Sequence, residues 1–372
     1  MRRSAVCALL AAAVSTAGGL TAMAPADADA PAAADTPAPG DPTVLVSGLN
    51  NPRQLALLGG RGLLIAEAGR GMQTGVCAAA SSCGGGTGSI SLIGDVAAQP
   101  PIARRIVSGL LSFADPDGGS AVGPDGVSAR SLTMIYIAMT DQGGVRAAAR
   151  RPARPIYSDA GKLLVLRAGR TRIVAADISA VEEALNPDGG DTDSDPYGVL
   201  VLPDGGQLVA DAGGNDILAV RGSHVSVFAV LPDHDGHHAM PTSLALDPDG
   251  AIRVGELNGQ QRDTARIWRL SRGGDILDWI GGLSTVTGVA VGADGTVYAS
   301  EMTGGDGLVP GQVTAIRRDN GRVHYPVPFP AGIAVDTARH LYVSAWSISD
   351  SDGISLGHGI TSPPGQVWRL TG

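Results

Sequence analysis

Short apolar runs alternate with compact turn sequences through most of the chain, and one stretch shows the complete pattern. An apolar run at 199–202 is followed by Pro-Asp-Gly-Gly at 203–206, a second run at 207–210, a Gly-rich turn at 211–215 and a third run at 216–220. Pro presets φ at the first turn position and Gly accepts a positive φ, so the Pro-Asp-Gly-Gly sequence predicts a hairpin. Three short runs joined by tight turns predict most of one antiparallel blade.

The same unit recurs along the chain, with starts at residues 52, 124, 196, 241, 286 and 330. The last intervals are 44 or 45 residues long and the first two are 72, so blades one and two carry insertions. A period of about 40–50 residues is typical of propeller blades. Residues 43–372 have room for six such units. The sequence therefore predicts an all-β fold, a six-bladed β-propeller of four-stranded antiparallel blades.

The two ends of this domain predict how the ring closes. Residues 44–46 form a lone apolar strand before the first repeat, and residues 366–370 form the last strand of the chain. An open ring would leave two unpaired strand edges. We expect the N-terminal strand to pair with the last strand and complete blade six. The alternative is an ordinary outer strand that closes nothing.

Two features between the repeats add detail. A short helix is predicted over residues 177–186, with Asp177 as its N-cap and an Asn-Pro pair at its end. Trp268 and Trp368 occur in matching third strands, and we expect both side chains to pack between blades.

The first 28 residues have the pattern of a secretory signal peptide, with a basic start, an apolar region at 5–20 and small-x-small steps up to Ala28. The apolar region is shorter than the ~20 residues that cross a membrane, so cleavage is favoured over a retained anchor and no membrane span is expected. Residues 29–42, rich in Ala, Pro and Asp, are typical of a disordered linker. The propeller at 43–372 is expected to be secreted and monomeric.

Charge excludes one class of partner. The chain has 36 acidic and 27 basic residues, a net charge of −9, and no basic run or stripe. The electrostatic pattern of nucleic-acid binding is therefore absent from the sequence.

Cysteines add one local constraint. Cys77 and Cys83 are the two cysteines beyond the signal peptide, and an exported protein meets oxidising conditions, so a disulfide is expected. It closes a short loop and stabilises the fold by only about 2 kcal/mol in the chain-entropy model. A zinc or redox pair is the alternative, but the spacing is not Cys-x-x-Cys.

Three segments carry a resemblance to a known family: NPDGGDTDSDPYG at 186–198, VADAGGND at 209–216 and MPTSLALDPDG at 240–250. They resemble the ScyD/ScyE family of exported, NHL-like six-bladed propellers. The resemblance extends over residues 44–370 and is loosest in blade two, where the family pattern carries His-Asp in place of Asp125-Gly126. It implies an exported six-bladed propeller and transfers no catalytic residue.

Chemistry is expected at one mouth of the central channel, where the starts of the innermost strands and the ends of the second strands gather. The candidate ligand-binding residues lie at the strand starts: Arg53, Asp195, Tyr197, Thr242 and Thr287. The candidate metal ligands are acids at the second-strand ends: Glu67, Asp211, Glu256 and Glu301. Like charges on a ring repel, so these acids either hold one divalent cation, Ca²⁺ or Zn²⁺, or pair with Arg53 or with backbone amides of the turns that follow.

Two further segments suggest metals and have simpler alternatives. Asp191, Asp193 and Asp195 alternate as in a Ca²⁺ loop, but Pro196 stands where such a loop needs Gly, and no Glu occupies the twelfth position. An EF-hand is excluded, which leaves a looser oxygen site or a solvated loop. The sequence Asp-His-Asp-Gly-His-His at 233–238 can hold a transition metal or form an exposed loop.

Motifs for other chemistry are absent: the sequence has no Gly-x-Ser-x-Gly elbow, His-Glu-x-x-His pair, phosphate loop or dinucleotide fingerprint. The leading hypothesis is a non-catalytic or accessory protein that binds a small molecule or another protein at the channel mouth. The alternative is a metal-dependent lactonase or hydrolase, in which one channel cation polarises a carbonyl and activates water. A quinone-dependent sugar dehydrogenase ranks last because no His stands at a repeat start.

Overall fold

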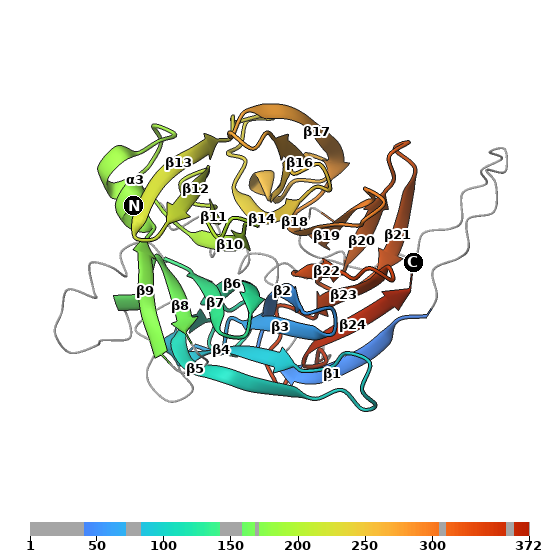
Figure 1. Ribbon diagram of the computed structural model, residues 1–372. Coiled ribbons are helices and arrows are strands. Elements are labelled where there is room, and N and C mark those ends of the chain that lie inside the picture. Colours follow the sequence, from blue (N-terminus) through green and yellow to red (C-terminus); the bar gives the residue numbers. More distant parts are fainter. Residues whose placement is uncertain are drawn as a thin grey trace.

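Six four-stranded antiparallel sheets surround one axis (Figure 1). The computed structural model describes residues 41–71, 83–141, 158–167, 171–304, 310–354 and 361–371. The predicted six-bladed propeller is confirmed. No helix within these ranges is long and apolar enough to span a membrane.

Blades 1–5 use consecutive strands, ordered from the axis outwards. Blade 1 contains β2 (Pro52–Leu58), β3 (Gly62–Glu67), β4 (Cys83–Ile93) and β5 (Ala103–Ala114). Blade 2 contains β6 (Pro124–Ser131), β7 (Met134–Met139), β8 (Lys162–Arg167) and β9 (Thr171–Asp177). Blade 3 contains β10 (Pro196–Val201), β11 (Gln207–Asp211), β12 (Asp216–Arg221) and β13 (His224–Val230).

The second half of the propeller repeats this order. Blade 4 contains β14 (Pro241–Leu246), β15 (Ile252–Glu256), β16 (Ala265–Leu270) and β17 (Ile276–Leu283). Blade 5 contains β18 (Val286–Val291), β19 (Val297–Thr303), β20 (Pro310–Ile316) and β21 (Arg322–Pro326). Blade 6 contains β22 (Ile333–Val335), β23 (His340–Ala345), β24 (Gly365–Thr371) and, outermost, β1 (Thr43–Leu49). A 3-10 turn, η2 (Asn258–Gln260), follows β15.

Blade 6 closes the ring as the sequence predicts. β1 pairs antiparallel with β24, with Val44 opposite Trp368 and Val46 opposite Val367. The first and last strands of the domain therefore lie side by side in Figure 1. This pairing covers an edge of β24 that would otherwise stay open.

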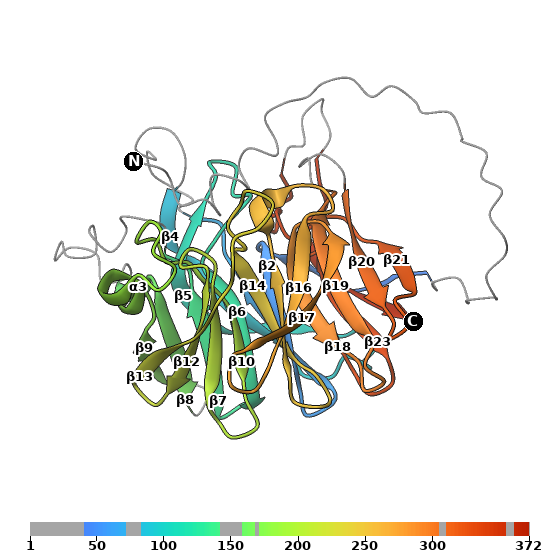
Figure 2. The same ribbon diagram turned by 90° about the horizontal axis from the view of Figure 1, so that it is seen from above.

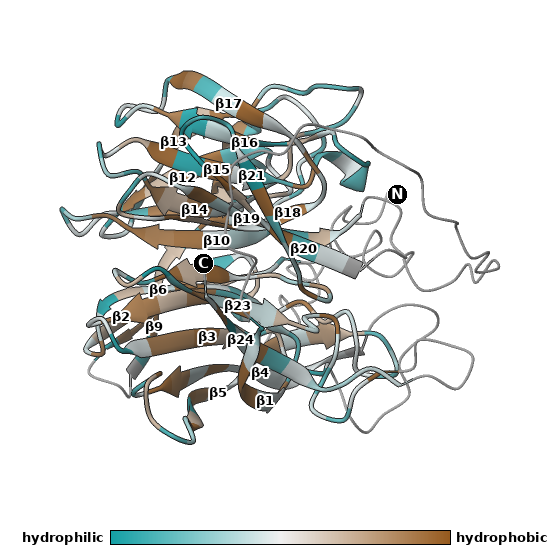
Figure 3. Ribbon diagram, turned by 90° about the vertical axis from the view of Figure 1, so that its right-hand side faces the viewer, coloured by the Kyte–Doolittle hydropathy of each residue, from teal (hydrophilic) through white to brown (hydrophobic). Residues whose placement is uncertain are grey.

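The core lies between the blades, because each sheet buries both faces against its neighbours. Inner and middle strands such as β3 and β10 are largely hydrophobic, whereas the connecting loops are polar (Figure 3). Trp268 packs with Leu208 and Val254 between blades 3 and 4, and Trp368 packs against the cluster between blades 5 and 6, as expected. Each large apolar side chain buried in this way contributes about 1.5–3 kcal/mol.

Close contact between neighbouring inner strands explains two glycines. A Cβ on Gly198 would lie 2.4 Å from the carbonyl oxygen of Thr242 in the next blade. A Cβ on Gly332 would lie 2.3 Å from the carbonyl oxygen of Arg53, across the junction of blades 6 and 1. A larger residue at either position would force the inner strands apart.

The predicted helix is confirmed as α3 (Ser179–Leu185), between blades 2 and 3. Its predicted N-cap is wrong: the cap position is Ile178, which makes no side-chain cap. Asp177 instead lies at the end of β9, directly opposite Lys162 of β8, and forms an ion pair with it. Because the Asp177 carboxylate pairs with Lys162 across the two strands, it does not cap the helix.

The propeller has two distinct ends (Figure 2). We call the end where β2, β6, β10, β14 and β18 begin the start face. The opposite end, which carries the hairpins between first and second strands, is the hairpin face.

Candidate functional site at the propeller axis

The innermost strands of five blades share a β-bulge one step after their first residue. Pro196 pairs with Asp211, but Gly198 already pairs with Ala210, so Tyr197 is an extra residue in its strand. The same one-residue shift occurs in β6, β14 and β18, and in β2 it falls between Pro52 and Leu55. A bulge redirects a side chain that would otherwise pack between sheets. The five bulge residues form what we call the axial ring: Arg53, Asp125, Tyr197, Thr242 and Thr287.

Two ring residues connect neighbouring blades. The hydroxyl of Thr242 donates to the carbonyl oxygen of Val286 at 2.7 Å, and that of Thr287 donates to the carbonyl oxygen of Pro330 at 3.0 Å. Both side chains are buried. Each threonine therefore satisfies a backbone acceptor at the start of the next blade.

A buried ion pair occupies the opposite part of the ring. Arg53 Nε lies 3.4 Å from Asp125 Oδ1, and both side chains are fully buried. Arg53 also donates through Nη2 to the carbonyl oxygen of Ala121. Within the described part of the chain, Nε and Nη1 of Arg53 and Oδ1 of Asp125 have no hydrogen-bond partner. Burial raises the pKa of Asp125 to about 7, although the Arg53 charge opposes the shift.

Asp195 and Tyr197 extend this cluster. Thr140 of blade 2 donates its hydroxyl to Asp195 Oδ1. Burial, and next the nearby Asp125 carboxylate, raise the pKa of Asp195 well above its usual range. Burial also raises the pKa of Tyr197 to about 12, against the attraction of Arg53. Tyr197 therefore keeps its hydroxyl proton at neutral pH.

A cavity of about 300 Å³ runs along the axis and is lined by all six innermost strands. Tyr197, Thr242 and Thr287 line it at the ring, and Val201 and Val291 line it near the hairpin face. The ring residues are buried, whereas these two valines are half-buried. The cavity is therefore closed at the ring and opens toward the hairpin face.

Gln54 narrows the closed end. Its side chain crosses from blade 1 past blade 2 to blade 3, where its amide donates to the carbonyl oxygen of Val199 at 3.0 Å. Its Oε1 accepts from the backbone amides of Val127 at 3.2 Å and Val199 at 3.1 Å. Gly126 leaves the space for this crossing, since a Cβ there would lie 3.0 Å from Gln54 Oε1.

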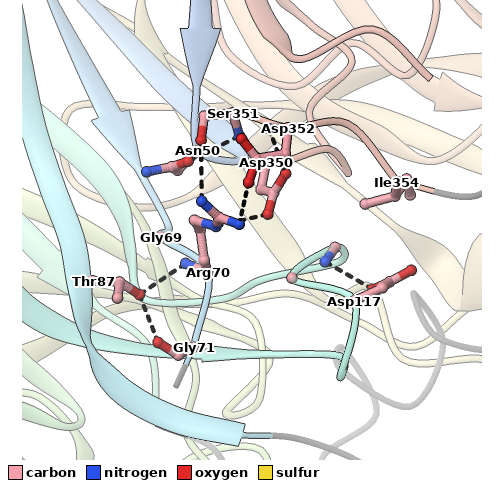
Figure 4. A network of polar contacts seen from close by, with 12 residues as sticks. Asn50, Gly69, Arg70, Gly71, Thr87, Asp117, Asp350, Ser351, Asp352 and Ile354 are labelled. Carbon is pink, nitrogen blue, oxygen red and sulfur yellow. Dashed lines mark hydrogen bonds and ion pairs between the residues drawn. The ribbon is translucent and has the colours of Figure 1, made fainter. Parts of the chain in front are cut away.

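Loops of blades 1 and 6 meet on the start face (Figure 4). Arg70 Nε lies 2.7 Å from Asp350 Oδ2, and its Nη2 lies 2.6 Å from Asp352 Oδ2. The backbone amide of Ser351 donates to Asn50 Oδ1 at 2.9 Å. Both contacts join the first and last blades beside the axis.

Asn51 joins the loop after β3 to the loop between β5 and β6. Its Nδ2 donates to the carbonyl oxygens of Gly69 at 2.8 Å and Gly118 at 2.9 Å, and its Oδ1 accepts from the amide of Ala121 at 3.2 Å. Asn51 is fully buried, as is Arg53 of the ring. The described loops thus cover the ring on the side where the sequence places the ligand-binding mouth.

The four acids proposed as metal ligands occupy one repeat position. Each is the pairing partner of the first residue of the innermost strand in its own blade: Glu67 of Pro52, Asp211 of Pro196, Glu256 of Pro241 and Glu301 of Val286. This register places the acids on the start face, at second-strand ends, as the repeat predicts.

Glu67 and Glu301 each accept from an amide in the loop before the first strand of their blade. Glu67 accepts from the amide of Asn50 at 2.8 Å and from Ser91 Oγ at 2.5 Å, and Arg105 pairs with it at 2.8 Å. Glu301 accepts from the amide of Ser284 at 2.8 Å. It also accepts from side chains of its own blade, Gln312 and Thr314.

The other two acids are similarly engaged. Asp211 accepts from the amide of Asp195 at 2.6 Å and from Ser194 Oγ at 2.6 Å. Glu256 accepts from the amide of Arg266 at 2.8 Å and from the Trp268 indole, and lies 2.6 Å from His234 Nε2. In the described ranges, no three His, Cys, Asp or Glu side chains gather as a metal would require.

The histidine-rich loop packs against blade 4. His234 lies between Glu256 and Asp235 and meets Trp268 edge-on at 5.7 Å between ring centroids. His238 Nδ1 lies 2.9 Å from Asp233. These contacts account for much of the 233–238 segment without a metal.

The alternating aspartates diverge in their surroundings. Asp191 is exposed, Asp193 is half-buried and Asp195 is buried against Thr140.

The expected disulfide cannot be placed, because Cys77 and the side chain of Cys83 lie outside the described residues.

Two site residues were missed by the sequence analysis. Asp125 follows the repeat start at residue 124, so the repeat alignment that identified Arg53 and Tyr197 also pointed to it. Gln54 had no comparable signal in the sequence, because its side chain narrows the cavity only by reaching from blade 1 to blade 3.

Comparison with known proteins supports the fold. No family model matches the chain, and no curated protein sequence matches it. The structure is similar to a protein assigned as a glucose dehydrogenase from Thermus thermophilus, with a TM-score of 0.53, 15% identity, and coverage of 89% of this chain and 99% of that one. It is also similar to a streptogramin B lyase, with a TM-score of 0.50, 13% identity, and coverage of 89% and 96%.

A third similar structure is a protein assigned as a gluconolactonase, with a TM-score of 0.50, 11% identity, and coverage of 89% of this chain and 91% of the other. Proteins named as a lyase, a lactonase and a dehydrogenase thus share this architecture. At such low identity the likeness defines a class of fold, the six-bladed propeller, and no activity.

Proposed function

We propose that this protein is a non-catalytic propeller that binds a small ligand in the axial cavity. The observation that carries the proposal is the cavity itself, closed by the axial ring and open at the hairpin face. Its volume of about 300 Å³ is at the lower end of the range for ligand pockets. Such a pocket suits a compact ring compound with one polar group.

The lining of the cavity supports the orientation of that ligand. Valine, leucine and alanine side chains line the inner strands, while the amide of Gln54 and the hydroxyl-bearing Tyr197 stand at the closed end. Because burial raises the pKa of Tyr197 to about 12, its hydroxyl stays a potential donor. The apolar part of the ligand would lie toward the hairpin face.

A metal-dependent hydrolase fits these residues less well. The oxygens of Glu67, Asp211, Glu256 and Glu301 already accept hydrogen bonds from amides in their own blades or in the loops directly before them. Turning any of them toward the axis would leave buried donors unpaired, at about 1–3 kcal/mol each. These four side chains therefore fit a structural role in their turns better than a shared Ca²⁺ or Zn²⁺.

Blocking the open end tests the proposal. Small cyclic compounds that carry one hydroxyl or carbonyl group are titrated into the protein by calorimetry, and the best binder is kept. Val291→Trp narrows the cavity where Val291 is half-buried, and we expect it to weaken binding at least about tenfold. The control Val174→Trp lies on an exposed outer strand and should leave affinity unchanged. Equal binding by Val291→Trp, or turnover of a lactone or ester by the wild type, contradicts the proposal.

We also propose that the chain is exported and belongs with the ScyD/ScyE propellers. The signal-peptide pattern of residues 1–28 and the segments at 186–198 and 240–250 support this assignment. N-terminal sequencing of protein recovered from the culture medium should find a start close to residue 29. An uncleaved chain retained in cells argues against export.

A further inference from the structure

Blade 3 contains a buried acidic cluster that lies away from the axial cavity. Glu182 of α3 and Asp216 at the start of β12 are 2% and 1% exposed. Both oxygens of Glu182 and Oδ1 of Asp216 have no hydrogen-bond partner among the described residues. Buried carboxylates of this kind normally have a counter-charge or donors.

The geometry brings the Glu182 side chain to the turn after which Asp216 begins β12. A Cβ on Gly214 would lie 2.9 Å from Glu182 Oε2, so the glutamate reaches from α3 onto the turn between β11 and β12. Asp216 begins the strand two residues after that glycine. A Cβ on the adjacent Gly213 would lie 2.8 Å from the carbonyl oxygen of Asp193, so a neutral backbone oxygen lies at the same turn.

The surrounding charges are of one sign. Burial raises the pKa of Asp216 to about 9, and Asp211, Glu182 and Asp188 raise it further. Burial also raises the pKa of Glu182 to about 7, with Asp188, Asp211 and Asp193 adding to the shift. The strongest electrostatic influences on both groups are therefore acids.

Neutral oxygen atoms complete the chemistry. Asn186, which ends α3 one turn after Glu182, has a buried Oδ1 with no partner among the described residues. Asp211 is less suited as a ligand, because Ser194 and the amide of Asp195 occupy its oxygens. What remains is two carboxylates with amide and carbonyl oxygens, and no nitrogen or sulfur donor.

We propose that Glu182 and Asp216 bind one Ca²⁺ ion between α3 and the β11–β12 turn, with Asn186 Oδ1 and backbone carbonyl oxygens completing its shell. Calcium accepts mixed carboxylate and carbonyl oxygens in irregular geometry, whereas Mg²⁺ demands near-octahedral geometry and Zn²⁺ favours nitrogen or sulfur. Because no three His, Cys, Asp or Glu side chains gather in the described ranges, most of the shell has to come from neutral oxygen atoms. The site goes beyond the proposed axial function and is independent of it.

Thermal unfolding and native mass spectrometry test the site. At about 5 mM Ca²⁺, above the Kd range of extracellular calcium modules, we expect the wild type to unfold several degrees higher than after chelation and to carry one Ca²⁺. Glu182→Gln keeps the side-chain shape and removes the charge, so it should lose both the shift and the bound ion. It should also unfold at a higher temperature than the chelated wild type, since repulsion with Asp216 is relieved.

The matched control is Glu183→Gln, the next residue on the same helix, which is exposed and changes net charge equally. It should keep the full response to Ca²⁺. The proposal is overturned if the wild type shows no response, if Glu182→Gln keeps it, or if Glu183→Gln loses it as well. An equal shift with Mg²⁺ also overturns the assignment to calcium.

Discussion

The axial ring has two unlike parts. In blades 4 and 5 the ring residues are Thr242 and Thr287, whose hydroxyls bond carbonyl oxygens of the following blade. In blades 1 and 2 they are Arg53 and Asp125, a fully buried ion pair in which atoms of both side chains lack a hydrogen-bond partner among the described residues. The same bulge in the same strand thus carries a satisfied structural contact in one part and an incompletely paired charge in the other.

This difference shows that equivalent ring positions differ in how fully their polar atoms are paired. A threonine hydroxyl that reaches the next blade is sufficient to join inner strands, so joining blades does not require charge. The buried pair loses hydration free energy that its attraction recovers only in part. Buried charges that are only partly compensated are expected at binding sites. Arg53, Asp125 and the adjacent Tyr197 are therefore the ring residues to test first.

The largest expected effect comes from breaking the ion pair. Arg53→Met leaves Asp125 buried without its counter-charge, and we expect it to lower the free energy of unfolding by about 3–5 kcal/mol. The double variant Arg53→Met/Asp125→Asn should recover much of that loss, because no uncompensated charge remains. Denaturant unfolding of both variants and the wild type measures the difference. A single variant as stable as the wild type would contradict the buried pairing.

The charged part should also make stability depend on pH. The pKa of Asp125 is raised in the folded state from 3.8 to about 7, so its contribution is fully present below about pH 4 and is lost as pH rises to about 7. The wild type should therefore lose up to about 1.4 kcal/mol per pH unit from this group within that window. Asp125→Asn should have a flatter profile, measured by unfolding at several pH values. Identical profiles would remove Asp125 as the cause.

A smaller effect is expected in the threonine part. Thr242→Val removes the donor to the carbonyl oxygen of Val286 while keeping the side-chain shape, and should cost about 1–2 kcal/mol. The control Thr242→Ser keeps the hydroxyl and should cost less. The denaturant midpoints of the two variants show which one is the less stable. If Thr242→Ser is less stable than Thr242→Val, packing of the methyl group matters more than the hydrogen bond.

The smallest effect is expected for an exposed pair. Arg61 and Asp95 lie 3.1 Å apart with side chains 70% and 39% exposed. Arg61→Ser should change the free energy of unfolding by less than about 0.5 kcal/mol. Denaturant unfolding of Arg53→Met and Arg61→Ser shows how strongly burial determines the contribution of an ion pair to the free energy of unfolding. Similar losses in both variants would contradict the distinction.

Much of the fold could be predicted because it repeats. The hairpin sequences and the spacing of starts defined six blades, and the lone strand at 44–46 predicted the closure that β1 and β24 make. The same alignment identified Arg53, Tyr197, Thr242 and Thr287 as inner residues. Asp125 was missed because its blade departs from the repeat elsewhere, although its position fits.

The rest depends on contacts that no repeat encodes. Gln54 narrows the cavity because its side chain reaches past blade 2 to blade 3, and the loops around Asn51 cover the ring from the start face. The acids at second-strand ends were expected to serve either a cation or nearby turns. Only side-chain placement shows that Glu67 accepts from the loop before its blade, whereas Glu256 accepts from Trp268 and lies against His234.

The most direct test of this account is native mass spectrometry of the wild type and of Glu67→Gln, Glu301→Gln and Glu182→Gln, before and after chelation. The account predicts that any divalent cation carried by the wild type is retained in Glu67→Gln and Glu301→Gln and is lost in Glu182→Gln. A metal-free wild type would overturn the calcium site in blade 3 and leave the turn role of the other acids standing. A cation lost in Glu67→Gln or Glu301→Gln would contradict the central claim and favour a metal-dependent enzyme.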